Sequence, residues 1–375
     1  AVEEAARAGI DVVVTDHHTP GATLPRAVAV VNPNRADSAY PDPALAGAGV
    51  AFKVCEALVD ARGGDPEALC YHLDLVALAT IADLAPLTGE NRVMVHYGLR
   101  VLAGSRKPGV RALVRSAGLA EEAVLLPRHV SHVLAPRINA AGRLGDAAPG
   151  VELLLAETEA DAERLARALE EKNRERRNVD AGTFADALRL LGESYDPDRD
   201  AAVVLAARGW HPGVIGIVAS RIVERIHRPT VLIALPPGGG HGRGSARSIP
   251  AFDLYAALRA CAEHLERFGG HRQAAGLEVR ADRVEAFRAA FCAWAGETLT
   301  PEDLVPELEI DLDVRLADAN AELYRYLRHF GPFGIGNPAP VFAARGVGVA
   351  GTPREVDRKS TRLNSSHSQI SYAVF

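Results

Sequence analysis

The sequence predicts an α/β protein of more than one domain, and three observations favour this fold class. A β-branched run at Ile10–Thr15 lies among helical patterns, and a long charged helix is predicted over Ala156–Leu191. Two apolar runs, Ala201–Ala207 and Pro229–Leu235, flank a third helical pattern at Val214–Ile226. Strands that alternate with helices are typical of parallel sheets covered by helices. The 375 residues suffice for two or three domains.

The first α/β layer is predicted from four segments. Val2–Ala8 has a helical pattern, and Ile10–Thr15 is typical of a buried parallel strand. Leu45–Gly64 is a glycine-rich entry into an amphipathic helix that ends at a glycine pair. Tyr71–Leu87 is helical in character and carries Asp83 near its end.

The remaining segments predict a connecting helix, a second α/β layer and the start of a third domain. Leu and Ala recur at three- and four-residue spacing in Ala156–Leu191, as in an amphipathic helix. Phe252–Phe268 predicts another helix, and Glu278–Val279 belongs to a strand. Glu307–Leu316 alternates apolar and charged residues, as in a half-exposed strand, and Val347–Val349 is strand-like.

Composition excludes several classes of protein. The chain is 48% hydrophobic and 24% charged, which is typical of soluble globular proteins, and it has no apolar run long enough to span a membrane. It has no signal-peptide pattern, so we expect a cytoplasmic protein. The net charge of −6 argues against a broad basic surface, although not against a local basic groove. The four cysteines lie far apart and are expected to be buried small hydrophobes.

Both ends of the chain look artificial. It begins at Ala1 and its single methionine is Met94, so we expect a fragment with a truncated N-terminus. The last segment, Asp357–Phe375, differs in style from the preceding sequence and back-translates as a sequencing-library adapter with Ser368-Gln369 at its index position. We expect this tail to be an artefact outside the natural fold.

Two acidic and histidine-containing segments are candidates for a metal site. Asp16-His17-His18 follows the Ile10–Thr15 strand directly, and the carboxyl ends of parallel strands open onto ligand crevices. An imidazole placed there can bind a metal, but the tripeptide alone is more typical of a solvated strand end. Asp83 is a carboxylate in an apolar segment, so it needs a cation, a metal or hydrogen bonds, or serves as a helix cap.

Three further segments have the composition of phosphate-binding loops. Leu134–Ala147 places Arg137, Asn139 and Arg143 among small residues; Gly242–Ser248 contains Ser245 and Arg247; and Phe268–Gly276 contains His271. Arginine is a bidentate donor to phosphate, and glycines allow the backbone N–H groups to approach an anion. Each loop alone could equally be a solvated surface loop. Together they indicate a protein that binds phosphate in two domains.

Taken in order, these motifs resemble the DHH phosphoesterase superfamily and, within it, the RecJ-type single-stranded-DNA-specific exonucleases. The resemblance is carried by seven segments: "GIDVVVTDHHTPG", "LVALATIADLAPL", "APRINAAGRLGDA", "GWHPGVIGIVASR", "GRGSARSI", "FGGHRQAAGL" and "FGPFGIGNPAPVF". It implies a truncated parallel-sheet DHH domain at 1–150, a connecting helix at 151–195, an α/β DHH-associated domain at 196–300 and a partial β-barrel OB-fold at 305–356. The artefact tail would occupy 357–375.

The resemblance also implies an activity, cofactors and partners. It implies 5′→3′ hydrolysis of single-stranded DNA in repair and recombination, at a two-metal Mn²⁺ or Mg²⁺ site between two domains. His17 and Asp83 would be metal ligands, Asp16 would orient the site and His18 would lie by the scissile phosphate. Arg137, Asn139 and Arg143 would hold the DNA backbone, whereas Ser245, Arg247 and His271 would bind phosphate at the 5′ end. Single-stranded DNA would be the partner of a monomer, together with a single-strand-binding protein and a helicase.

One departure from the family pattern leaves alternatives open. The aspartate motifs that precede the DHH motif in the family are absent from residues 1–375, so we expect this chain by itself to be inactive. A phosphoesterase of short oligonucleotides or cyclic dinucleotides is one alternative, which the long helix and the third domain disfavour. A non-catalytic scaffold of the same superfamily is another, and the presence of His17, His18 and Asp83 argues against it.

Overall fold

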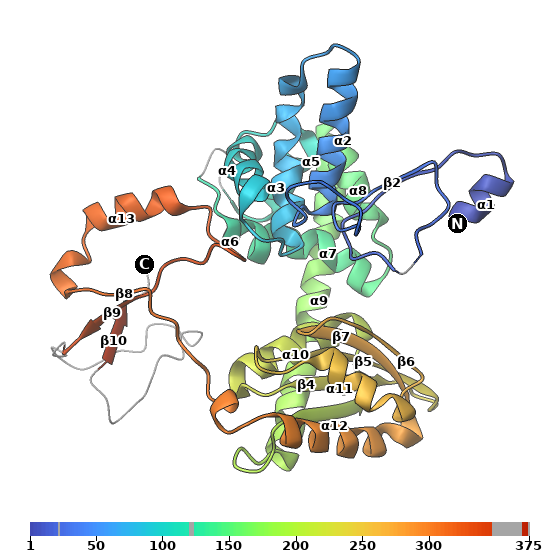
Figure 1. The fold of residues 1–375 in the computed structure, drawn as a ribbon, viewed down its shortest axis with the longest axis vertical. Coiled ribbons are helices and arrows are strands. Elements are labelled where there is room, and N and C mark those ends of the chain that lie inside the picture. Colours follow the sequence, from blue (N-terminus) through green and yellow to red (C-terminus); the bar gives the residue numbers. More distant parts are fainter. Residues whose placement is uncertain (22, 120–123, 347–369, 374–375) are drawn as a thin grey trace. The chain divides into compact units, whose positions relative to one another are not determined.

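The computed structural model describes residues 1–375 except 22, 120–123, 347–369 and 374–375 (Figure 1). The chain packs as two compact units that each combine separate stretches of sequence. The first unit comprises Ala1–Pro136, Leu153–Ala166 and Leu308–Phe375, and the second comprises Arg137–Glu152 and Arg167–Glu307. We describe each unit by itself. The linear domain boundaries predicted above stay a prediction.

The first unit is mainly helical. Its strands are β1 (Val13–Thr15) and β2 (Ala29–Val31), and its helices up to Pro136 are α1 (Val2–Arg7), α2 (Gly47–Ala61), the 3-10 helix η1 (Pro66–His72), α3 (Leu73–Ala82), α4 (Gly89–Ala103), α5 (Pro108–Ser116), α6 (Pro127–His129) and the π-helix η2 (Val130–Leu134). The predicted helices at Val2–Ala8, Leu45–Gly64 and Tyr71–Leu87 are therefore confirmed, with shorter bounds.

Helix α3 is the buried centre of this helical group. Gly98 of α4 lets the two helices approach closely, because a Cβ atom there would lie 2.3 Å from the carbonyl oxygen of Leu73. Near its start, α3 carries Asp74, whose fully buried carboxylate accepts hydrogen bonds from Ser105 and Lys107. A buried charge is tolerated only when it is paired in this way. These contacts fix the helix that ends at Asp83.

The strand predicted at Ile10–Thr15 differs from expectation in burial. Parallel pairing is confirmed, since Val13, Val14 and Thr15 of β1 lie opposite Ala29, Val30 and Val31 of β2. The side chain of Val13, however, is 59% exposed, so the prediction of a buried strand is wrong. Among the described residues these two strands form a sheet of two, which has too little area to bury both faces.

The second unit is built on a five-stranded mixed sheet (Figure 1). The strand order is β3-β4-β5-β7-β6; β3 and β4 are parallel, and the other neighbours are antiparallel. The strands are β3 (Val203–Arg208), β4 (Thr230–Leu235), β5 (His241–Arg247), β6 (Arg267–Gly270) and β7 (Ala274–Arg280). The helices are α7 (Ala135–Leu144), α8 (Ala148–Leu155), α9 (Glu159–Ser194), α10 (Pro212–Ile226), α11 (Leu254–Ala260) and α12 (Val284–Thr298), of which α7, α8 and α9 extend into both units.

Alternation along the strands gives this sheet a core on each face. Val204 and Ile233 pack with α11 and α12 around Phe287, whereas Leu205 and Leu232 pack with α9 and α10. Successive side chains of a strand point to opposite faces, so a strand covered on both faces needs a continuous apolar run, as β3 and β4 have. The predicted long helix and the two strands flanking Val214–Ile226 are confirmed.

Two predictions for the second unit are wrong in detail. The helix predicted at Phe252–Phe268 ends at Ala260, and Arg267–Gly270 is the edge strand β6. The supposed loop Gly242–Ser248 is the central strand β5. Its glycines serve packing, because a Cβ atom at Gly244 would lie 2.6 Å from a methyl carbon of Leu277.

The C-terminal stretch of the first unit forms a small three-stranded sheet. Its elements are the 3-10 helix η6 (Leu316–Asp318), α13 (Ala321–Leu327), and the strands β8 (Leu312–Asp313), β9 (Phe342–Arg345) and β10 (Ile370–Ala373), in the order β10-β9-β8. These described strands do not close into a barrel. The predicted strand at Val347–Val349 lies outside the described residues, as does most of the predicted tail. This stretch also contains the 3-10 helix η7 (Arg328–Phe330).

The second unit contains the 3-10 helices η3 (Ala262–His264), η4 (Ala281–Arg283) and η5 (Glu302–Leu304).

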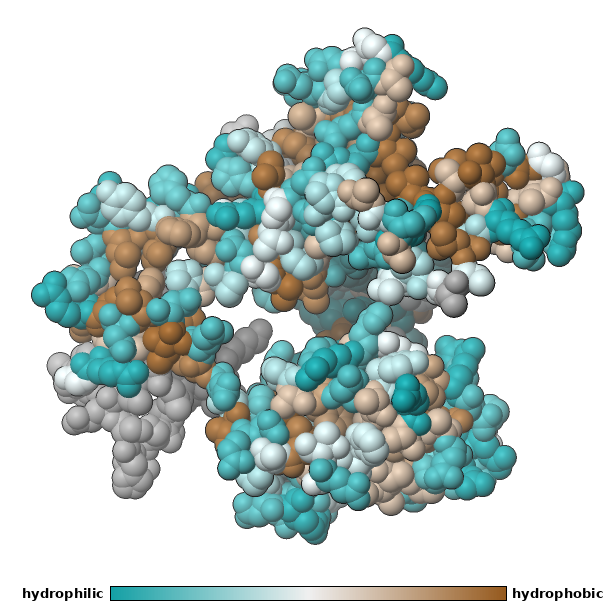
Figure 2. All heavy atoms as spheres, viewed as in Figure 1, coloured by the Kyte–Doolittle hydropathy of each residue, from teal (hydrophilic) through white to brown (hydrophobic). Residues whose placement is uncertain are grey.

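Two predictions from composition can be compared with the structure, which has hydrophilic and hydrophobic residues mixed on the face drawn in Figure 2. Within the described part of the chain, no helix is both long and apolar enough to cross a membrane. Cys261 is buried and Cys292 is partly buried, but Cys55 and Cys70 are exposed. The expectation of four buried cysteines is therefore wrong for these two, because their helix faces point to solvent.

Candidate active site

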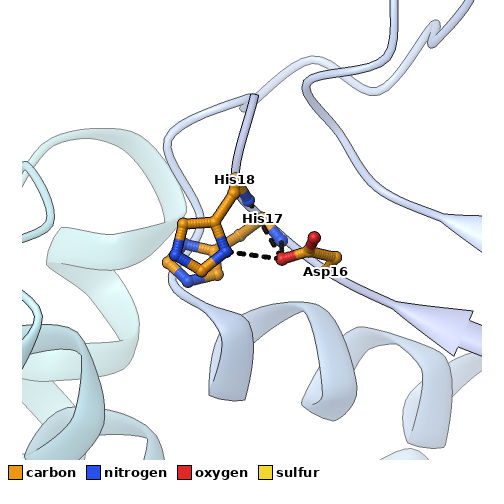
Figure 3. Close-up of side chains that lie close together, drawn as sticks. All are labelled: Asp16, His17 and His18. Carbon is orange, nitrogen blue, oxygen red and sulfur yellow. Dashed lines mark hydrogen bonds and ion pairs between the residues drawn. The ribbon is translucent and has the colours of Figure 1, made fainter. Parts of the chain in front are cut away.

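Asp16, His17 and His18 follow β1 and bring their side chains together (Figure 3). One ligand atom from each residue lies within 4.8 Å of the others, and the two imidazole centroids are 4.3 Å apart. Asp16 Oδ1 accepts hydrogen bonds from the backbone N–H groups of His17 and His18 and lies 2.8 Å from His18 Nδ1. One carboxylate oxygen therefore shapes the loop and orients the second imidazole.

These hydrogen bonds also set the charge of Asp16. The backbone N–H of His18, followed by its ring, holds the pKa of Asp16 below its ordinary value, because both stabilise the carboxylate. Asp16 is thus an anion at neutral pH.

Asp83 brings a second carboxylate to this site from a different element. It is the residue at which α3 ends, and Leu84 beyond it has a left-handed backbone with φ 58° that stops the helix. Asp83 Oδ2 lies 3.5 Å from His17 Nδ1. The His17 ring also lies against the start of α2, because a Cβ atom at Gly47 would be 3.2 Å from its Cδ2. The structure thus joins the two candidate segments that are 65 residues apart in sequence.

The donor set suits a divalent metal ion. Two imidazoles and two carboxylates offer nitrogen and oxygen ligands, which transition metals and Mn²⁺ accept. The His17 side chain is 21% exposed and Asp83 is 49% exposed, so an ion could reach both from solvent. Hydrogen bonding of His18 to Asp16 is the arrangement by which a carboxylate fixes the orientation of an imidazole.

A second cluster of candidate residues lies within the second unit. Arg143, at the end of α7, donates a hydrogen bond to the carbonyl oxygen of Gly213, in the first turn of α10. Ser245 and Arg247 of β5 lie against the same helix, since a Cβ atom at Gly216 would be 2.9 Å from Ser245 Oγ and 2.8 Å from an Arg247 nitrogen. Three residues predicted to bind phosphate therefore surround the start of α10.

Arg247 has the environment of an anion-binding residue. Its guanidinium donates to Ser245 Oγ and to the carbonyl oxygen of Ala246, which are both neutral groups. Burial, and then the like charge of Arg143, lowers the pKa of Arg247. A partly buried cation beside another cation is stabilised when an anion binds between them.

The other predicted phosphate-binding residues are placed differently. Arg137 forms a 2.7 Å ion pair with Glu170 of α9 and is only 11% exposed, whereas Asn139 and His271 are exposed. Residues 135–144 form a helix, so the prediction of a glycine-rich loop there is wrong. The roles of Arg137, Asn139 and His271 stay predictions.

Several residues near the two clusters were missed by sequence reasoning. Asn32 and Asn34 donate hydrogen bonds to the backbone of His18 and His17, although neither residue is among the candidates named from the sequence. Burial lowers the pKa of Arg176, and the charge of Arg143 lowers it further, so this residue of α9 belongs near the arginine cluster. The sequence alone did not distinguish Arg176 from the other charged residues of this long helix.

Comparison with known proteins identifies the family to which this chain is similar. Family models match residues 1–80 (DHH family, N-terminal domain), 200–297 (DHHA1 domain) and 310–375 (RecJ OB domain). The single-stranded-DNA-specific exonuclease RecJ of Bacillus subtilis is 40% identical over 88% of the chain and 41% of its own length. Crystal structures include RecJ of Thermus thermophilus in complex with Mn²⁺, which is 36% identical with a TM-score of 0.80 over 92% of the chain and 49% of its own.

A second crystal structure, of exonuclease RecJ bound to manganese, is 37% identical with a TM-score of 0.66 and covers 81% of the chain and 74% of its own. The chain belongs to the RecJ family. The predicted family and fold class are confirmed. This RecJ-family chain spans about two fifths of the Bacillus relative and about half of the Thermus protein, so it corresponds to part of each.

Proposed function

We propose that this chain forms part of a metal-dependent exonuclease that hydrolyses phosphodiester bonds of single-stranded DNA from the 5′ end, in DNA repair and recombination. One observation carries the proposal. Asp16, His17, His18 and Asp83 converge in a chain that is similar over 92% of its length to a RecJ structure holding Mn²⁺. The names of the relatives supply the substrate class, single-stranded DNA.

The metal would be Mn²⁺ or Mg²⁺, held by His17 and Asp83. Their facing atoms are 3.5 Å apart, and small shifts would bring both to one ion. Such ions, when bound as a pair, activate a water molecule and stabilise the leaving oxygen of the phosphodiester. Asp16 would orient His18 through their 2.8 Å contact, so that the imidazole can donate to a phosphate oxygen. Further carboxylate ligands would come from the aspartate motifs that precede the DHH motif in the family.

The arginine cluster of the second unit would bind the DNA backbone. Arg247 and Arg143 offer guanidinium donors beside the start of α10, and Ser245 adds a hydroxyl. The positive end of the helix dipole also favours an anion there. Asn139, His271 and, once released from Glu170, Arg137 would add phosphate contacts. A single-strand-binding protein and a helicase would be partners of a monomer, which size-exclusion chromatography with each purified partner tests.

The decisive experiment separates metal binding from hydrolysis. Asp83→Asn should weaken Mn²⁺ binding to the chain by at least about 100-fold, because it removes a ligand, whereas Asp65→Asn, at an exposed cap of η1, should not. In a chain that carries the aspartate motifs ahead of Ala1, the first variant should also abolish release of mononucleotides from a 5′-phosphorylated 20-mer. Faster hydrolysis of a dinucleotide than of the 20-mer would contradict the proposal, as would full activity of the Asp83→Asn variant.

A further inference from the structure

Apart from the hydrogen bonds that Asp16 Oδ1 accepts, the loop Asp16–His18 has few means of holding its own shape. It follows a three-residue strand with no buried side chain, and the side chains of Asp16 and His18 are 43% and 73% exposed. Packing therefore contributes little to its order. A ligand loop must nevertheless keep its donor atoms within a fraction of an ångström of the required geometry.

Hydrogen bonds from one short turn fix the backbone of this loop. Asn32 Nδ2 donates to the carbonyl oxygen of His18 at 2.8 Å, and Asn34 Nδ2 donates to that of His17 at 2.7 Å. Asn32 Oδ1 accepts from the backbone N–H of Asn34 at 2.8 Å, which fixes the carboxamide with its NH₂ group toward His18. Both histidine carbonyls thus have a side-chain donor.

The turn itself is anchored on three sides. It follows β2 directly, as Asp16 follows β1, and the N–H of Asp16 donates to the carbonyl oxygen of Val31 at 3.0 Å. Asn32 is only 6% exposed. Asn34 also donates to the carbonyl oxygen of Pro43 at 3.1 Å, which ties the loop to the segment leading into α2. The His17 ring is bounded by that helix at Gly47.

Asparagine is the side chain that this arrangement requires. Its carboxamide is donor and acceptor at once, so Asn32 can bond to His18 and close the turn at Asn34. Aspartate has the same size but presents only acceptor oxygens, which would face the histidine carbonyls. Alanine would leave both carbonyls without these donors.

We propose that Asn32 and Asn34 are positioning residues that hold His17 and His18 in the geometry that binds the metal ion. Neither carboxamide needs to contact metal or substrate, since each acts through the backbone of a histidine. The part of this inference that concerns metal binding rests on the proposed function. The part that concerns the order of the loop does not depend on it.

The test uses Asn34→Ala, Asn34→Asp and Asn32→Ala in the 375-residue chain, with Asn337→Ala as the matched control. Asn337 Nδ2 also donates to two backbone carbonyls, those of Phe330 and Pro332, neither of which belongs to a histidine. Hydrogen exchange read by mass spectrometry reports residues 13–19 and, as an internal reference, α3. Binding of Mn²⁺ is followed by the electron paramagnetic resonance signal of the free ion.

Each Asn32 and Asn34 variant should speed exchange in residues 16–19 by about fivefold, the effect of one lost hydrogen bond, and leave α3 unchanged. Each should also weaken Mn²⁺ binding by about 10-fold. Unchanged exchange in the loop, equal acceleration in α3, or Mn²⁺ affinity equal to that of the control would each overturn the proposal. If the unmodified chain binds no Mn²⁺, the proposed function fails, while the exchange measurement still decides whether the asparagines order the loop.

Discussion

The two candidate sites are built in opposite ways. Asp16–His18 follows an exposed strand of a two-stranded sheet and is shaped by side-chain hydrogen bonds. Ser245 and Arg247 lie on the central strand of a five-stranded sheet with a core on each face. The difference indicates that polar contacts hold the histidines, whereas packing holds the arginine cluster. Substitutions in the core, at the cluster and in the loop should therefore have separable effects.

The largest expected effect sharpens the contrast in packing. Phe287→Ala should destabilise the second unit by about 3–5 kcal/mol, because Phe287 is fully buried. Val13→Ala in β1 should change the free energy of unfolding by less than about 0.5 kcal/mol, since Val13 is 59% exposed. Urea unfolding followed by circular dichroism measures both. Equal changes in the urea midpoint of the two variants would contradict this contrast, because they would show that Val13 is packed as tightly as Phe287.

An intermediate effect separates binding from folding at the arginine cluster. Arg247→Met should weaken binding of single-stranded DNA by about 10-fold, because a phosphate contact is lost. The slope of the logarithm of the binding constant against the logarithm of the salt concentration should become shallower by about one. Stability should stay equal or rise, since a partly buried cation without a carboxylate among its hydrogen-bond partners is removed. Fluorescence anisotropy at several salt concentrations measures binding.

Arg267→Met is the control for this prediction. Arg267 lies on β6 of the same sheet and pairs with Glu278 at 2.7 Å on an exposed surface. DNA affinity should be retained in this variant. A large loss of stability in Arg247→Met would instead make Arg247 a structural residue.

The smallest expected effect concerns acid and the histidine loop. The folded-state pKa of Asp16 is lowered, mainly by the backbone N–H of His18, so the stabilisation is present above its ordinary value of 3.8. It is lost as the pH falls through the lowered value. The protection factors of residues 16–19, meaning exchange rates corrected for the pH dependence of intrinsic amide exchange, should therefore fall below about pH 4 in the unmodified chain. Asp16→Asn should abolish this dependence, and an identical pH profile in both chains would refute the assignment.

The sequence alone predicted the parts of the site that have a chemical signature. From the residues alone, Asp16-His17-His18 and Asp83 were separate candidates, and the resemblance to the DHH superfamily implied that they share a site; the structure places His17 and Asp83 3.5 Å apart. The motif order predicted the RecJ family, which the comparisons show. Periodicity predicted the long helix because it spans several repeats of the helical pattern, and two apolar runs predicted β3 and β4 of the second unit.

Other features depended on contacts between distant segments. Glycines at 242 and 244 have the composition of a loop, and only the side chains of Ile233 and Leu277 against them show that a strand is required. The exposure of Val13 depends on how many strands neighbour it, which a β-branched run does not encode. The bonds from Asn32 and Asn34 to the two histidines arise because parallel strands end at the same edge of a sheet. The sequence by itself determined which groups are candidates for the chemistry. Tertiary structure decided what holds them, because hydrogen-bond partners and packing neighbours are set by proximity in space.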